Sequence, residues 1–176
     1  MKLRDATPRD AAAIAAIYGP YVQTSAFSFE EIPPDADEMA ARMKKITEAG
    51  LPYLVAEEEG LVAEDAGKVA GYAYASAFHT RSAYRFTVEN SVYVAPQSTR
   101  AGTGTLLMRR LISECAERGL RQMIARIGDG ENIASIALHE KLGFRRIGEL
   151  RGVGFKFGRW VDVVEMQLVL GPQRPA

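Results

Sequence analysis

Apolar residues change their spacing within the stretch that runs from Val88 to Cys115. Residues 88–94 are rich in β-branched side chains and predict a strand, which ends before Pro96 because proline has no N–H to donate to a ladder. After a polar turn with two glycines, apolar side chains recur along one helix face, so an amphipathic helix is predicted. The residues of this face are Leu107, Met108, Leu111, Ile112 and Cys115.

The rest of the chain alternates between the two patterns. Strands are predicted at residues 2–6, 53–57, 68–77, 121–127, 144–148 and 161–169. Helices are predicted after the Thr7–Pro8 start signal, at residues 35–49, and from Asn132 to Gly143. The glycine-rich segment 152–160 joins the last two strands, and the acidic segment 58–67 indicates a solvated hairpin tip. Together these elements predict a single α/β (α+β) domain at residues 1–170 and a loose tail at 171–176.

Composition narrows the classes of partner. The chain has 176 residues, enough for one domain with its own core, and its 22 acidic side chains balance 22 basic ones. Because no net field results, neither a nucleic acid nor a membrane partner is expected. The N-terminus has no apolar signal-peptide core and no run of about 18 apolar residues occurs, so a cytoplasmic protein is expected. The single cysteine, Cys115, is expected to pack in the core rather than to act as a nucleophile.

The turn between the strand and the helix has the features of a phosphate site. Gly102 and Gly104 remove Cβ atoms, so a large group could approach the backbone. The first N–H groups of a helix have no partner within the helix and lie at the positive end of its dipole, and Arg100 adds a full charge. A pyrophosphate cradle is therefore predicted between Ser98 and Thr105. The alternative is a tight turn without a ligand, since the spacing matches neither G-x-G-x-x-G nor the P-loop.

The same turn resembles that of a known family. Its sequence, T-R-A-G-T-G, is similar to the R/Q-x-x-G-x-G/A pyrophosphate loop of the GCN5-related N-acetyltransferases, which bind acetyl-CoA. Three further segments resemble the phosphinothricin and methionine sulfoximine acetyltransferase branch: T-V-E-N-S-V-Y-V, N-I-A-S-I-A-L-H-E-K-L-G-F and G-F-K-F-G-R-W-V-D. The resemblance covers nearly the whole chain and departs from the loop pattern at Thr99, where the family has Arg or Gln. It implies a mixed, mostly antiparallel sheet flanked by helices, acetyl-CoA bound at a splayed strand pair, no metal, and a homodimer.

The resemblance also implies that the strand and the turn hold acetyl-CoA. The strand would offer its backbone to the pantetheine arm, with the Val94 N–H as the donor to a developing oxyanion. Core packing is the competing use of Tyr93, and Asn132 could contact the pantetheine arm or simply cap its helix. The residues expected to contact acetyl-CoA are Val92, Tyr93, Val94, Arg100, Ala101, Gly102, Thr103, Gly104, Thr105 and Asn132.

Transfer of an acetyl group from a thioester to an amine requires a base, and it benefits from an acid that protonates the leaving thiolate. Glu89 lies among apolar residues on the strand that leads into the turn, where partial desolvation would raise its pKa toward the working pH. The family has its proposed base at this position; the alternative is an outward-facing Glu89 paired with Arg85. His139 stands where the family places an acid, and with an ordinary pKa near ~6.5 it could donate a proton, orient other groups or be structural.

The acceptor should be small. Arg81 and Arg85 could bind its carboxylate in a bidentate manner, while Phe29 and Tyr84 would supply apolar walls beside Glu89. The alternatives are solvated surface arginines and an aromatic lid over the core.

By the resemblance, the glycine-rich segment near the C-terminus closes the pocket and meets a partner subunit. Trp160 is expected in the core or in an interface, and Asp162 is expected to orient the turn. The function implied is an acetyl-CoA-dependent N-acetyltransferase that acts on the α-amine of a small amino-acid-like acceptor, by direct transfer in a ternary complex. Two alternatives stay open: acetylation of peptide N-termini or other amines, and a non-catalytic acyl-CoA-binding module.

Overall fold

A computed structural model describes residues 1–58 and 67–171. Seven strands form one sheet in the order β1-β2-β3-β4-β5-β7-β6. The strands are β1 (Lys2–Asp5), β2 (Tyr53–Glu57), β3 (Val69–Ala77), β4 (Thr87–Val94), β5 (Gln122–Gly128), β6 (Arg145–Lys156) and β7 (Arg159–Val169). The helices are α1 (Ala11–Thr24), α2 (Ala36–Glu48), α3 (Thr103–Glu117) and α4 (Ile133–Lys141). Every neighbouring strand pair is antiparallel except β4 and β5, so the predicted mixed, mostly antiparallel sheet is confirmed.

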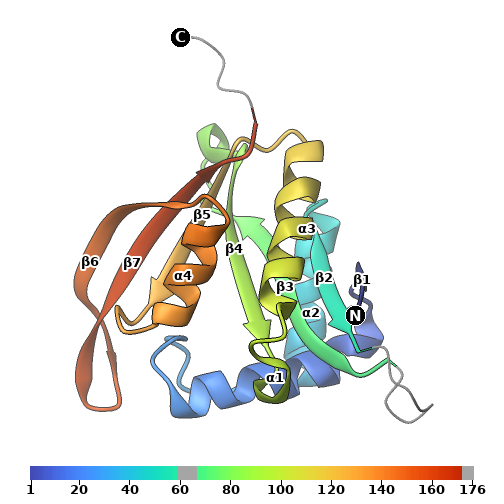
Figure 1. Ribbon diagram of the computed structural model, residues 1–176, viewed down its shortest axis with the longest axis horizontal. Coiled ribbons are helices and arrows are strands. Elements are labelled where there is room, and N and C mark those ends of the chain that lie inside the picture. Colours follow the sequence, from blue (N-terminus) through green and yellow to red (C-terminus); the bar gives the residue numbers. More distant parts are fainter. Residues whose placement is uncertain (59–66, 172–176) are drawn as a thin grey trace.

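The sheet is covered by helices on both faces (Figure 1). Along β2, Leu54 and Ala56 pack toward α3, whereas Tyr53 and Val55 pack toward α1 and α2. This alternation follows from the two-residue period of a strand. The predicted apolar face of α3 lies against the sheet, and Cys115 is fully buried within it. The core expectation for this cysteine is therefore confirmed.

The parallel pair β4 and β5 stays together over a short distance only. Thr87, Val88 and Glu89 pair with Gln122, Met123 and Ile124, and the pairing stops there. Beyond Glu89 the strand β4 continues to Val94 with β3 as its partner. The sheet is thus split along one side of β4, starting at Glu89.

The C-terminal strands are longer than the sequence predicted. The segment 152–160, expected to be a connection, is mostly strand, because β6 continues to Lys156 and β7 begins at Arg159. The pairing of β6 with β7 shifts its register between Leu150 and Gly154, so the glycine-rich sequence forms an irregular part of the strand and not a loop. The connection itself is a tight turn at Phe157 and Gly158, whose φ angles of 52° and 73° are those of a two-residue hairpin turn.

Two expectations concern residues that the structure does not describe. The predicted acidic hairpin tip lies mainly at 59–66, and the predicted tail at 172–176, and both ranges fall outside the described residues. Within the described part of the chain, none of the helices combines the length and the apolar character needed to cross a bilayer.

Candidate active site

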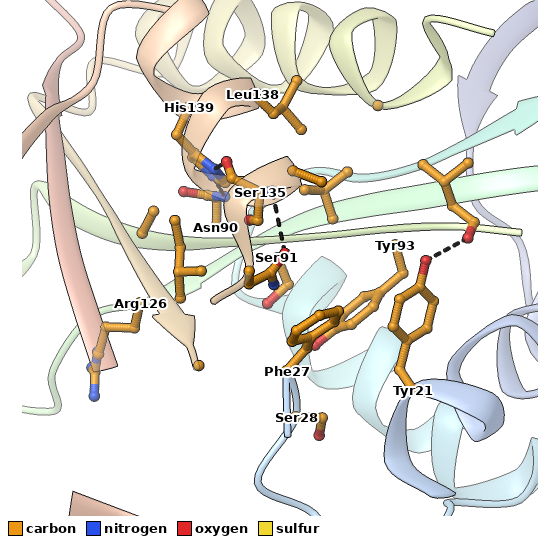
Figure 2. Close-up of a pocket in the computed structure, with 18 of the residues that line it drawn as sticks. Tyr21, Phe27, Ser28, Asn90, Ser91, Tyr93, Arg126, Ser135, Leu138 and His139 are labelled. Atoms are coloured by element: carbon orange, nitrogen blue, oxygen red, sulfur yellow. Dashed lines mark hydrogen bonds between the residues drawn. The ribbon is translucent and has the colours of Figure 1, made fainter. Parts of the chain in front are cut away.

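A cleft of about 1130 Å³ opens where β4 and β5 separate. Its walls come from β4, the end of β5, the turn before α3, the helix α4 and the loop that follows α1 (Figure 2). A site for one drug-sized ligand usually measures ~300–1,000 Å³. The volume lies just above this range, so the cleft has room for a large ligand.

The turn before α3 forms one end of the cleft. Arg100 and Gly102 have φ angles of 64° and 83°, so the chain bends twice through the left-handed region before the helix begins. A Cβ at Gly104 would lie 3.3 Å from Leu138 Cδ2 and 3.6 Å from Val94 Cγ2. Glycine therefore leaves space at this wall of the cleft that a larger residue would fill. Of the residues predicted for this turn, Ala101 does not line the cleft. Those that do are Arg100, Gly102, Thr103, Gly104 and Thr105.

The backbone of β4 forms the long side of the cleft. Ala95 N–H donates to the Ala70 carbonyl of β3 at 2.8 Å. Since successive residues of a strand point their N–H groups to opposite sides, the Val94 N–H points away from β3, toward the split. The Tyr21 hydroxyl donates to the Val94 carbonyl at 2.7 Å and holds this strand end against α1 (Figure 2).

The ring of Tyr93 is used for packing. It lies edge-on to Tyr18 and Tyr21, with ring centroids 4.8 and 5.2 Å apart, and stacks on Tyr72. Both uses that the sequence suggested for Tyr93 are thus compatible, because the ring packs while the backbone lines the cleft.

Glu89 lies at the point where the split begins. Its carboxylate forms an ion pair with Arg126 of β5, with 2.6 Å between Oε2 and Nη2, and not with Arg85 as the alternative supposed. The Glu89 side chain is 27% exposed and lines the cleft. Burial raises the pKa of this carboxyl; Arg126 opposes that shift, and Glu165 of β7 adds to it. A carboxylate with a raised pKa at the wall of a cleft has the properties of a general base.

His139 is buried between two groups of the protein. Its Nδ1 lies 2.8 Å from the Ser135 carbonyl, which can only accept, so Nδ1 carries the proton. Its Nε2 lies 2.9 Å from Asn90 Nδ2 and accepts from that amide. Burial lowers the pKa of the imidazole, which favours the neutral ring. This arrangement favours an orienting role for His139 over that of an acid toward the thiolate.

One of the two roles suggested for Asn132, that of a helix cap, is present in the structure. Its Oδ1 accepts from Ser135 N–H at 3.2 Å, so it caps α4. It also lines the cleft, at the end of α4 that faces the separated strands.

The loop after α1 closes the other end of the cleft. The Tyr18 hydroxyl lies 2.6 Å from Ser28 Oγ and donates to Glu30 at 2.9 Å, and Lys156 Nζ of β6 donates to the Ser28 carbonyl at 2.7 Å. The ring of Phe29 fills a slot made by two glycines, Gly128 and Gly154, where any Cβ would collide with it or its loop. The loop is thereby fixed to the β6–β7 hairpin, and Phe29 lines the cleft.

Replacing Gly154 by alanine should disturb this slot, because the new Cβ would overlap the Phe29 ring. We expect Gly154→Ala to lower the free energy of unfolding by about 1–3 kcal/mol, the usual cost of overpacking. On the same strand, a Cβ at Gly148 meets its nearest neighbour, Glu165 Oε2, at an ordinary 3.6 Å, so Gly148→Ala should change stability by about 0.5 kcal/mol or less. Urea unfolding of both variants measures the difference; equal stabilities would contradict this packing.

Three residues predicted for the acceptor are not brought to the cleft. Arg81, Tyr84 and Arg85 lie in the exposed turn between β3 and β4, outside the residues that line it. Tyr84 packs on Phe78 and His79 instead, and the Arg85 guanidinium lies over the Phe86 ring. Trp160 is 69% exposed, which excludes it from the core of this chain. Asp162 accepts from the Gly152 N–H at 2.7 Å, and this bond lies at the irregular part of β6 and not at the Phe157–Gly158 turn.

Asn90 and Arg126 line the cleft although the sequence did not single them out. Asn90 could have been found by alternation, since it follows Glu89 and must point to the opposite face, where His139 is. Arg126 carries no comparable signal, because its place depends on the register between β4 and β5. The described residues contain no group of three or more His, Cys, Asp or Glu side chains that could hold a metal ion.

Comparison with known proteins agrees with this geometry. The profile of the acetyltransferase (GNAT) domain matches residues 3–164. The chain belongs to the GNAT acetyltransferase family. The resemblance seen in the sequence is thereby confirmed, and this acetyltransferase shares its fold with relatives of known structure.

Two relatives and one solved structure are especially similar to this acetyltransferase. The phosphinothricin N-acetyltransferase of Alcaligenes faecalis is 52% identical over 158 residues, which cover 90% of this chain and 77% of the relative. The L-methionine sulfoximine/L-methionine sulfone acetyltransferase of Pseudomonas aeruginosa is 39% identical over 174 residues, 99% of this chain and 97% of the relative. The crystal structure of a phosphinothricin acetyltransferase from Sinorhizobium meliloti in complex with AcCoA has a TM-score of 0.89 and 46% identity, and covers 97% of this chain and 88% of its own.

Proposed function

We propose that this acetyltransferase transfers the acetyl group of acetyl-CoA to the α-amine of a small amino-acid-like acceptor, of the phosphinothricin or methionine sulfoximine type. The observation that carries the proposal is the position of Glu89, whose raised pKa and exposure to the cleft coincide with the start of the split between β4 and β5. The names of the two relatives support the acceptor class, and the S. meliloti complex supports acetyl-CoA as the donor.

The cleft residues fit acetyl-CoA in two places. The turn from Arg100 to Thr105 offers the helix N-terminus and a guanidinium to a diphosphate, with Gly104 leaving room for it. The free edge of β4 offers the backbone groups of Val92 and Val94 to a pantetheine arm, much as a sheet edge accepts an added strand. When bound there, acetyl-CoA supplies an activated acyl group as a thioester.

Direct transfer in a ternary complex defines the tasks of the protein groups. The amine nitrogen forms a bond to the carbonyl carbon while the C–S bond breaks and the sulfur keeps its electron pair. Of the two protons that the ammonium nitrogen loses, one goes to Glu89 and then to solvent, directly or through a water, and the other ends on the coenzyme thiol. The Val94 N–H donates to the carbonyl oxygen as negative charge develops there. His139 is neutral and accepts a hydrogen bond from Asn90, and this bond holds α4 against β4.

An assay of thiol release from acetyl-CoA tests the proposal against its alternatives. With L-phosphinothricin, L-methionine sulfoximine or L-methionine sulfone as acceptor, the thiol of CoA should be released. Mass spectrometry should show one acetyl group on the α-nitrogen of each acceptor. Turnover of short peptides alone would replace the acceptor class with peptide N-termini. Binding of acetyl-CoA without thiol release from any amine would identify a binding module and overturn the proposal.

The proposal includes a cytoplasmic homodimer. Apolar side chains are exposed along the β6–β7 hairpin, where a single chain leaves them in contact with water; they are Ile147, Leu150, Val153, Phe155, Phe157 and Trp160. Exposed apolar patches of this kind are typical of protein interfaces. Sedimentation equilibrium should give twice the mass of the chain, and a monomer mass at micromolar concentration would contradict the dimer.

A further inference from the structure

An amino-acid acceptor brings a carboxylate into the cleft, and this charge needs a cationic partner. Among the described residues that line the cleft, the basic side chains other than His139 are Arg100, Arg126 and Lys141. Arg100 belongs to the turn before α3, and Lys141 to the last turn of α4. Arg126 is the one of the three that lies beside Glu89.

The register of the sheet places Arg126 on the same face as Glu89. Glu89 pairs with Ile124, and the side chain two residues further along β5 points to the same face as Ile124. Arg126 lies just past the point where β4 and β5 part, so its guanidinium borders the open part of the cleft. The side chain is 41% exposed, and its guanidinium lies 5.4 Å from the centre of the Phe78 ring.

We propose that Arg126 is the carboxylate-binding residue of the acceptor site, and that its guanidinium turns from Glu89 to the α-carboxylate when the acceptor binds. This inference rests on the proposed function. The pair of Glu89 and Arg126 carries one negative and one positive charge side by side, and an α-amino acid zwitterion carries the complementary pair. Exchange of partners therefore leaves no charge unpaired, since the ammonium meets Glu89 while the carboxylate meets Arg126.

The exchange also prepares the base. While Arg126 is bound to Glu89 it lowers the pKa of that carboxyl, against burial and against Glu165 of β7. Tyr74 of β3 also interacts electrostatically with Glu89, as a neutral phenol at working pH because burial raises its pKa. Once the guanidinium turns to the substrate carboxylate, the ammonium takes its place beside Glu89, so the carboxylate that accepts the proton is paired with the group that must lose it.

The experiment compares an amino acid with its α-carboxamide, which keeps the amine and the side chain and removes the negative charge. L-Methionine sulfone and L-methionine sulfone amide are the two acceptors, and KM and kcat are measured for wild type, Arg126→Leu, Arg126→Lys and the exposed control Arg109→Leu. We expect wild type to favour the acid, and Arg126→Leu to raise KM for the acid by about 10–100-fold, the loss of one charge-assisted contact. KM for the amide should change by less than about 3-fold, and Arg126→Lys should recover part of the preference.

A second readout is the pH profile with the amide as acceptor. Removal of the guanidinium should raise the pKa of Glu89, so the acidic limb of kcat/KM should move to higher pH in Arg126→Leu and stay in place in Arg109→Leu. Equal loss on acid and amide, or a wild type without preference between them, would overturn the carboxylate role while leaving the proposed function intact. Absence of thiol release by wild type with either acceptor would overturn both. If Arg126→Leu fails to fold, Arg126→Lys and Arg126→Gln answer the same comparison.

Discussion

Replacing Glu89 by glutamine should lower kcat by about 10²–10⁴-fold, the usual effect of removing a general base, with little change in acetyl-CoA affinity. The amide keeps the size of the side chain, so the cleft should keep its shape. In wild type, kcat/KM should fall as the pH drops through the pKa of Glu89, which burial raises above that of an ordinary glutamate. The glutamine variant should lack this limb. Steady-state kinetics across the pH range measures both effects.

A matched variant distinguishes loss of the base itself from loss of a negative charge near it. Glu165 of β7 raises the pKa of Glu89 but does not line the cleft. Glu165→Gln should therefore keep the plateau of kcat within about 3-fold and move the acidic limb to lower pH. Unaltered turnover in Glu89→Gln, or the same loss in both variants, would remove Glu89 from the role of base.

Placing aspartate at Gly104 should raise the dissociation constant of acetyl-CoA by about 10–100-fold, because a carboxylate there would repel the diphosphate and displace its hydrogen bonds. The new side chain would start 3.3 Å from Leu138 and 3.6 Å from Val94, at the wall of the cleft. Isothermal titration calorimetry with acetyl-CoA gives the constant directly.

The control for Gly104→Asp puts the same charge on the same helix turn but outside the cleft. Leu106 is 43% exposed and does not line the cleft, so Leu106→Asp should leave the constant within about 3-fold of wild type. If both variants weakened acetyl-CoA equally, or neither did, the diphosphate would have to lie away from this turn.

Local patterns in the sequence predicted most elements of the fold. The helix face from Leu107 to Cys115 and the cap at Asn132 depend on neighbouring residues alone, and both are present in the structure. The β6–β7 hairpin was predicted too short, because the glycines that usually indicate a loop are absorbed here by a register shift within β6. At one of them, Gly154, a Cβ would overlap the ring of Phe29, which lies more than a hundred positions earlier in the chain.

The acceptor side of the site could not be predicted in the same way. Arg85 is close to Glu89 in sequence, but it lies in the exposed turn before β4, and the cleft extends from Glu89 in the opposite direction, toward Val94. Arg126 is far from Glu89 in sequence and becomes its ion-pair partner through a parallel register that no local pattern encodes. A contact between side chains on two different strands of a sheet could therefore be identified only from the structure.

A crystal structure with acetyl-CoA and a non-reactive acceptor analogue tests the account most directly. We predict the diphosphate on the backbone amides between Arg100 and Thr105, the pantetheine arm along β4, and the acceptor nitrogen within hydrogen-bonding distance of Glu89 or one water away from it. A thioester bound far from Glu89, or a diphosphate held elsewhere on the protein, would contradict the account.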